Sequence, residues 1–175
     1  YEHFRRTQLF ASFADPDLAK LVDGVELLAF AAGSVVCSEG DGAVFGAASH
    51  SIFNVVEMHE GDDPREKAGG TETEAGIYFI RSGSAEVLAK SINGNYDSSS
   101  PIIADVGEGS YFGDVSLIQK KPRTASVRAR SVLICYTLSA ERLFEALENF
   151  PYCHTYLITI ARRRLQRSRG MAKEC

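Results

Sequence analysis

The residues best suited to chemistry lie in one stretch, from Tyr111 to Arg130. Gly113 has no Cβ, so its backbone can approach another group closely. A short turn with helical spacing begins here, and its first backbone amides belong to Gly113, Asp114, Val115 and Ser116. Amides at the start of a helix can point at an oxyanion. Arg123 follows about ten residues later, and its charge completes a predicted pocket for a single phosphate.

Asp114 adds a carboxylate to the same pocket. A carboxylate repels phosphate, but it can accept a hydrogen bond from a sugar hydroxyl. A ligand that carries both a phosphate and a hydroxyl is a nucleotide. The simpler alternative is that Asp114 only caps the short helix, as many Asp residues do.

The second half of the stretch has the alternation of a strand with one buried face. Ala125, Val127 and Ala129 share one face, and the polar residues between them share the other. Arg123 falls on the same face of the strand as these apolar residues. Because an unpaired buried guanidinium is costly, an arginine at the edge of an apolar face requires an anion.

This stretch resembles the phosphate-binding cassette of the cyclic-nucleotide-binding domain family, which reads Phe-Gly-Glu, an apolar turn and then Arg-(Thr/Ala)-Ala-(Ser/Thr)-Val. Six positions match without a gap: Gly113, Arg123, Thr124, Ala125, Ser126 and Val127. The sequence from Arg123 to Ala129 is most similar to that of hyperpolarisation-activated and cyclic-nucleotide-gated channels. One position differs, because Asp114 stands where the family usually has Glu.

The resemblance implies a ligand, cAMP or cGMP, and neither a cofactor nor a metal. The ligand-binding residues that it implies are Phe112, Gly113, Asp114, Val115, Ser116, Arg123, Thr124 and Arg164. In this interpretation Arg123 neutralises the cyclic phosphate, Asp114 accepts from the ribose hydroxyl and Arg164 meets the purine. Thr124 does not decide between the two bases.

Many short strand-like runs with helices only at the ends predict a mainly β fold with a closed or rolled antiparallel sheet. The resemblance makes it a jelly-roll-like β-roll. We expect one domain over residues 1–175, with N-terminal helices over 1–24, the roll over 25–138 and two C-terminal helices over 139–170. Relative to the family, a long insertion occupies about residues 43–75, and its run at 52–56 could add a strand.

Two helix caps and one buried charge are predicted at the ends of the chain. Asp15 before Pro16, and Ser139 before an apolar stripe, are good N-caps. In the last helix Arg164 falls in the middle of an apolar stripe formed by Leu157, Ile160, Ala161 and Leu165. Arg164 therefore faces the protein or its ligand. The alternative is that it reaches water or pairs with an acid such as Glu145.

The composition is that of a globular protein, with 45% hydrophobic and 24% charged residues. A net charge of -4 gives no general attraction to nucleic acid. We find no apolar run of membrane-spanning length and no signal peptide, and the first residue, Tyr1, favours a fragment of a longer protein. Four scattered cysteines without a Cys-x-x-Cys pattern indicate reduced buried thiols, and the histidines show no metal-ligand spacing.

We therefore expect a non-enzymatic regulatory domain of a larger protein, on the cytoplasmic face of a membrane. A cation channel that is tetrameric in the full protein is the expected parent. No catalytic motif supports an enzyme, and no helix-turn-helix pattern follows the last helix. Two alternatives stay open: a channel-type roll that no longer binds nucleotide, and the regulatory domain of a cyclic-nucleotide-dependent kinase.

Overall fold

The computed structural model describes residues 2–11, 13–41, 76–89 and 100–174. The predicted insertion at about 43–75, with its possible strand, lies outside these residues. The elements in chain order are α1 (Glu2–Arg6), the 3-10 helix η1 (Gln8–Phe10), α2 (Asp15–Val22), β1 (Glu26–Phe30), β2 (Val35–Cys37), β3 (Gly76–Ser82), β4 (Ser84–Leu88), β5 (Ile102–Gly107), β6 (Tyr111–Phe112), α3 (Asp114–Gln119), β7 (Ser126–Ala129), β8 (Leu133–Ser139), α4 (Ala140–Glu148) and α5 (Pro151–Glu174).

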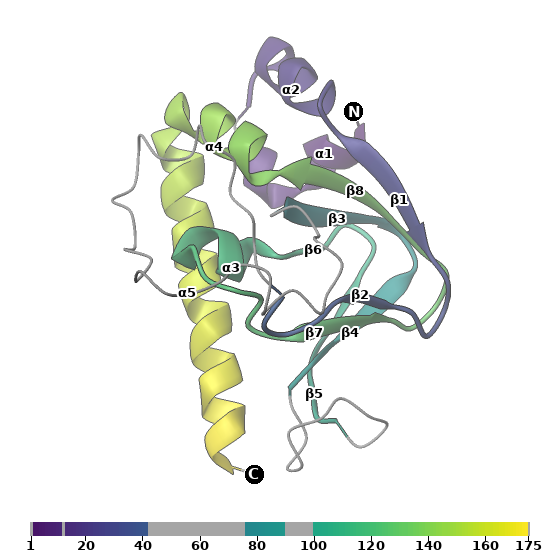
Figure 1. Ribbon diagram of the computed structural model, residues 1–175. Helices are drawn as coiled ribbons and strands as arrows, with labels where there is room; N and C mark the ends of the chain where they lie inside the picture. Colours follow the sequence, from purple (N-terminus) through teal and green to yellow (C-terminus); the bar gives the residue numbers. More distant parts are fainter. Residues whose placement is uncertain (1, 12, 42–75, 90–99, 175) are drawn as a thin grey trace, which may run out of the picture.

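Two four-stranded antiparallel sheets form the centre of the fold (Figure 1). The strand orders are β1-β8-β3-β6 and β2-β7-β4-β5. Neighbouring strands in each sheet are often distant in sequence, which is the connectivity of a jelly-roll-like β-roll. The predicted fold class, a β-roll with helices at both ends, is confirmed.

Strand β3 separates the two hydrophobic cores of the molecule. Tyr78 and Ile80 point between the sheets, where they join the buried residues of β6, β7 and β8. Ile77 and Phe79 point to the opposite face, where helices from both ends of the chain cover the sheet. Since side chains alternate along a strand, a strand buried on both faces fixes the position of the helices relative to the roll.

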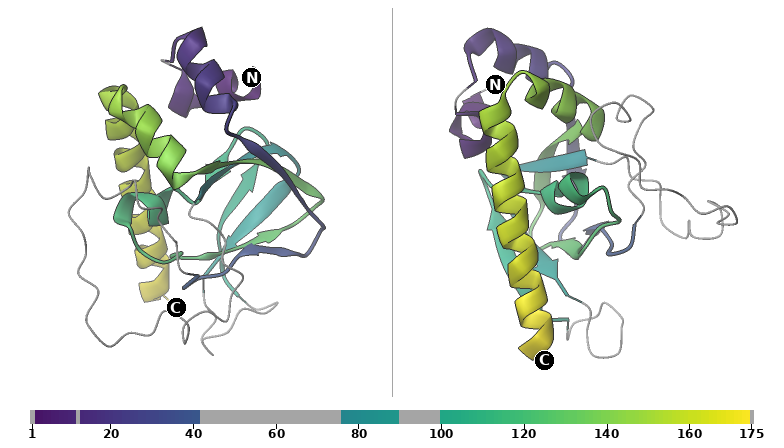
Figure 2. Two further views of the ribbon diagram at one scale, coloured as in Figure 1. Left: turned by 45° about the horizontal axis from the view of Figure 1, so that its top comes forward. Right: turned by 90° about the vertical axis from the view of Figure 1, so that its left-hand side faces the viewer.

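Helix α5 runs along one side of the roll and lies against α3 (Figures 1 and 2). Leu157 and Ala161, two residues of the predicted stripe, are buried. Arg164 continues this face toward the C-terminal half of the helix, so it is directed at α3 and β6. The packing of α5 thus brings Arg164 to the predicted phosphate pocket.

One of the two predicted caps is correct. Ser139 accepts a hydrogen bond from the backbone amide of Arg142 at 3.4 Å and so caps α4. The prediction for Asp15 is wrong by one residue, because α2 begins at Asp15 and its N-cap is Ala14, which has no side-chain cap. The Asp15 carboxylate forms an ion pair with Arg5 on the preceding segment.

Candidate ligand-binding site

The site begins at a left-handed turn between β6 and α3. Gly113 has φ 92° and ψ -8°, a conformation that costs other residues about 1–2 kcal/mol. A Cβ at this position would lie 2.7 Å from the Gly76 carbonyl oxygen and 2.8 Å from Arg123 Nη1. Glycine is therefore required both by the backbone conformation and by the close approach of Arg123.

Arg123 is almost fully buried, with 4% of its surface exposed. Its Nη1 donates to Ser116 Oγ at 3.0 Å and to the Gly113 carbonyl at 3.3 Å, and its Nη2 donates to the Gly76 carbonyl at 3.1 Å. The guanidinium carbon also lies 5.7 Å from the centre of the Tyr78 ring. Every one of these partners is uncharged.

The guanidinium of Arg123 therefore contacts no carboxylate in the part of the chain that the structure describes. A buried guanidinium without a carboxylate is unusual, because burial removes the solvation of the charge and neutral acceptors replace it only partly. The arrangement favours an anion next to Arg123. A phosphate with two free oxygens suits the planar, two-pronged guanidinium.

The backbone of Arg123 is fixed as firmly as its side chain. The Gly40 amide donates to the Arg123 carbonyl at 2.8 Å, and the Arg123 amide donates to the Asp41 carbonyl at 3.0 Å. The neighbouring Glu39 amide donates to Ser126 Oγ at 2.9 Å. The turn after β2 thus holds the start of β7 in place, and the guanidinium is positioned before any ligand arrives.

Asp114 forms the second part of the site. It is 1% exposed, its Oδ1 accepts from Arg164 Nη1 at 2.6 Å, and its Oδ2 is buried without a hydrogen-bond partner among the described residues. Burial raises the pKa of this carboxyl, while Arg164 and the backbone amides of Asp114 and Val115 lower it. An unsatisfied buried oxygen is costly, and Oδ2 therefore retains its capacity to accept a hydrogen bond.

Arg164 connects α5 to this carboxylate. Its Nη1 also donates to the Tyr111 carbonyl at 3.1 Å, and its guanidinium carbon lies 4.5 Å from the centre of the Tyr111 ring. The side chain is 34% exposed. Pairing with an acid was the alternative that the sequence left open, but the acid is Asp114 and not Glu145.

The structure brings together most of the predicted site residues. Gly113, Ser116 and Arg123 form one contact group, and Asp114 and Arg164 form the other. Phe112 stacks in parallel on Tyr78, with ring centres 4.9 Å apart. Val115 and Thr124 are half-buried, and neither side chain forms a hydrogen bond with these groups among the described residues.

Three contacting residues were missed from the sequence: Gly76, Tyr78 and Tyr111. Gly76 is 47 residues from Arg123 in the chain, and Tyr111 is 53 residues from Arg164. No local pattern shows such contacts. Only Tyr111 gave a signal, because it immediately precedes the predicted pocket.

Two negative findings apply to the described residues. In this part of the chain no cluster of three or more His, Cys, Asp or Glu side chains is arranged to bind a metal ion. None of the helices there combines the length and the apolar character needed to cross a membrane. Of the four cysteines, Cys37, Cys135 and Cys153 are buried and form no disulfide with one another, and Cys175 lies outside the described residues.

Comparison with known proteins gives one family and several relatives. Residues 68–150 match the family model of the cyclic nucleotide-binding domain. The human potassium/sodium hyperpolarization-activated cyclic nucleotide-gated channel 4 is 37% identical over 91 residues, which are 52% of this chain and 7% of that protein. The chain therefore spans only a small part of this relative's length.

Solved structures share the fold at lower identity. The cAMP-bound PfPKA-R has a TM-score of 0.68 and 13% identity, covering 98% of this chain and 45% of that chain. The regulatory subunit of a cAMP-independent protein kinase A from Trypanosoma brucei has a TM-score of 0.66 and 14% identity, covering 99% of this chain and 50% of that chain.

Proposed function

We propose that this chain, which carries a domain of the cyclic nucleotide-binding family, binds cAMP or cGMP in the cluster around Arg123 and Asp114. One observation carries the proposal: the buried Arg123 guanidinium contacts only neutral acceptors within the described residues. A cyclic phosphate brings one negative charge and two free oxygens to this position. The first amides of α3 lie beside it, although α3 is too short for its dipole to contribute much.

In this proposal the ribose of the nucleotide binds the second part of the site, at Asp114. A hydroxyl that donates to Asp114 Oδ2 satisfies an oxygen that is otherwise buried and unpaired. Asp114 is one methylene shorter than the Glu usual in the family. Because Oδ1 is bound by Arg164 at 2.6 Å, we assign Oδ2 to the ribose hydroxyl, and the ligand has to open this buried position to reach it.

Helix α5 is the element that responds to the ligand in this proposal. Arg164 can exchange part of its contact with Asp114 and Tyr111 for a contact with the purine, either by stacking or by hydrogen bonding. Such an exchange stabilises one position of α5 against the roll. The helix then transmits binding to the rest of the parent protein as a shift between two positions.

The proposed parent is a cyclic-nucleotide-modulated cation channel, tetrameric, with this domain on the cytoplasmic face of the membrane. The 37% identity to a hyperpolarization-activated channel supports this choice. A kinase regulatory subunit is the second candidate, supported by likeness of fold at 13% identity. In either parent the domain is regulatory and performs no catalysis itself.

Calorimetric titration with cAMP and with cGMP tests the proposal. The parent chain should bind at least one of them, and Arg123→Ala should weaken that binding by at least about tenfold. Arg128→Ala is the matched control, because Arg128 points to the outer face of the roll and pairs with Glu86 at 2.8 Å. No binding by the folded parent would establish the alternative, a roll that does not bind nucleotide.

A further inference from the structure

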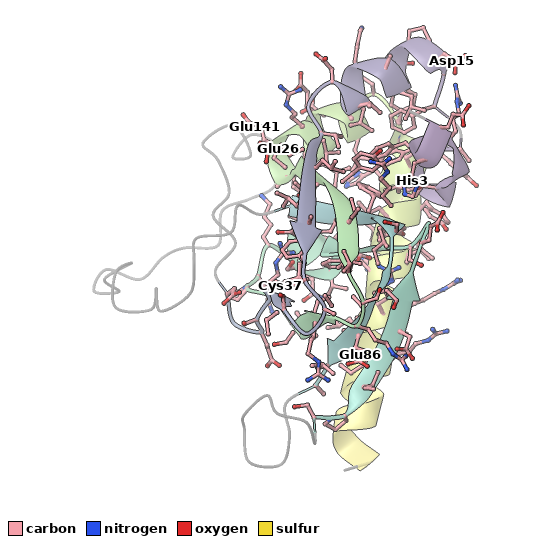
Figure 3. All side chains as sticks on the ribbon, turned by 90° about the vertical axis from the view of Figure 1, so that its right-hand side faces the viewer. His3, Asp15, Glu26, Cys37, Glu86 and Glu141 are labelled. Atoms are coloured by element: carbon pink, nitrogen blue, oxygen red, sulfur yellow. The ribbon has the colours of Figure 1, made fainter. Side chains whose placement is uncertain are left out.

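A cavity that borders the proposed nucleotide site lies where β1, β3 and β8 meet the beginning of α4. Its volume is about 680 Å³, within the range of about 300–1,000 Å³ typical of small-molecule sites. None of the eight predicted site residues is among the described residues that line it. Figure 3 shows its side of the molecule, where Glu26 marks β1 and Glu141 marks the start of α4.

Charges of both signs line this cavity. Asp23 and Glu26 supply carboxylates and Arg142 supplies a guanidinium. None of the three side chains forms an ion pair with another described residue. The cavity therefore presents separated positive and negative groups that do not neutralise each other directly.

Gly24 sets the position of the Arg142 guanidinium. The Arg142 side chain lies against Gly24, where an added Cβ would be only 2.1 Å from Nη1 and 2.3 Å from Cδ. Gly24 lies between Asp23 and Glu26 in the chain, so Arg142 packs against the same segment that carries both carboxylates. Any larger residue at position 24 has to displace it.

The geometry points to a second binding site, for a small zwitterion with an apolar body, of the amino-acid class. Its carboxylate would bind Arg142 and its ammonium group would bind Asp23 or Glu26. Apolar walls for the body and hydroxyls for further hydrogen bonds come from Val25, Leu28, Tyr78, Thr137 and Ser139. A ligand with a single charge satisfies only one side of the cavity.

The two sites share a wall. Gly76 and Tyr78 line this cavity, and the same residues hold Arg123 through the Gly76 carbonyl at 3.1 Å and the Tyr78 ring at 5.7 Å. A zwitterion against this wall should therefore change the affinity of the anion site, and the anion should change zwitterion affinity by the same factor. This coupling rests on the proposed function, whereas the cavity site does not.

The first experiment needs no nucleotide and no variant. The parent chain, labelled with ¹⁵N, is titrated with L-phenylalanine, phenylpropionate and phenylethylamine while amide shifts are followed by NMR. L-phenylalanine should shift amides around the cavity, and each singly charged analogue should bind at least about tenfold more weakly, because it lacks one charge-assisted contact. Absence of shifts up to the solubility of L-phenylalanine, or equal affinity for the three probes, overturns the inference.

Two variants place the site in the cavity. Gly24→Ala moves the guanidinium without changing any charge, and Arg142→Gln removes the charge. Both should weaken L-phenylalanine binding by at least about fivefold to tenfold. Lys20→Ala is the control, since Lys20 lines a neighbouring cavity of about 290 Å³. If all three variants bind L-phenylalanine like the parent, the inference fails. Unchanged amide NMR peaks from residues far from the cavity verify that each variant is folded.

The coupling is measured last, by titrating cAMP into the parent with and without saturating L-phenylalanine. A change of at least about twofold in cAMP affinity, lost in Gly24→Ala, is expected from typical coupling free energies. An unchanged affinity removes the coupling and leaves the cavity site in place. If the parent binds no cAMP at all, the proposed function fails, while the zwitterion titrations still decide the cavity site.

Discussion

Replacing Arg123 by Met separates its role in binding from any role in folding. The guanidinium donates three hydrogen bonds to neutral acceptors in the described structure, each contributing about 1.5–3 kcal/mol because the donor is charged. Against this stands the desolvation of a side chain only 4% exposed, which costs several kcal/mol. The two contributions nearly cancel, and Met fills a similar volume with apolar atoms.

We therefore expect Arg123→Met to change the free energy of unfolding by less than about 2 kcal/mol in the absence of nucleotide. Nucleotide binding should lose about 1.5–3 kcal/mol, a decrease in affinity of at least about tenfold. Binding is thus expected to suffer more than stability, in contrast to an ordinary buried salt bridge, where removal of one partner destabilises the fold by about 3–5 kcal/mol.

Urea denaturation with and without cAMP measures both quantities. With cAMP at about 100 times its Kd, the parent should gain about 2.7 kcal/mol of stability. At the same concentration the variant should gain no more than about 1.4 kcal/mol, since its Kd is at least about tenfold higher. Arg128→Met should keep the full gain.

Two results would refute the reasoning. If the variant keeps the whole cAMP-induced gain, the anion does not bind at Arg123. If the variant without nucleotide loses more than about 4 kcal/mol, the neutral hydrogen bonds outweigh desolvation and Arg123 is a structural residue.

Four further predictions concern the same site. Asp114→Ala should weaken nucleotide binding, and Asp114→Glu should retain or strengthen it. The parent should bind the deoxyribose analogue more weakly than the ribose nucleotide, whereas Asp114→Ala should bind the two ligands with equal affinity. Calorimetry measures these affinities. Arg164→Ala should weaken the binding free energy by roughly 1–2 kcal/mol, while Arg163→Ala, at an exposed position, should change it little. Nucleotide should slow amide hydrogen exchange in α5 of the parent, and it should slow this exchange less in Arg164→Ala. Gly113→Ala should lower stability by about 1–2 kcal/mol because of φ 92° and weaken binding by displacing Arg123; denaturation and titration measure the two effects. Burial raises the pKa of the Asp114 carboxyl, so the folded domain binds the carboxyl proton more tightly than the unfolded chain does. The parent should therefore lose stability relative to Asp114→Asn as the pH rises from the usual aspartate pKa through the raised pKa of the folded state.

Each of these has an opposite outcome. Equal losses for the deoxyribose analogue in the parent and in Asp114→Ala would make Asp114 a helix cap. Identical behaviour of the two arginine variants would exclude α5 as the closing element. A Gly113→Ala protein that binds normally would show that Arg123 adapts to a Cβ, and parallel pH curves for parent and Asp114→Asn would contradict the burial of the carboxylate.

The sequence predicted local features better than contacts between distant segments. The alternation after Arg123 identified a strand with Val127 and Ala129 buried, and the glycine before Asp114 identified the turn. Whether these residues hold nucleotide stays a prediction. The sequence did not predict that Asp114 is the partner of Arg164, because an apolar stripe shows which face of a helix is buried but not what it meets.

The caps illustrate the same limit on a smaller scale. Ser139 and Asp15 are equally good by residue type, yet only Ser139 occupies the cap position. Asp15 has Arg5 within reach, and a tertiary ion pair competes with the local preference. Gly76 and Tyr78 touch Arg123 only because the roll closes, so no window of sequence contains the information.

The two backbone anchors of Arg123 bear on how this domain can be lengthened. Asp41 bonds the arginine's amide, and Gly76 bonds its guanidinium, so the chain on either side of residues 42–75 is fastened to one and the same residue. A reporter grafted between Asp41 and Gly76 should therefore leave both hydrogen bonds of Arg123 in place.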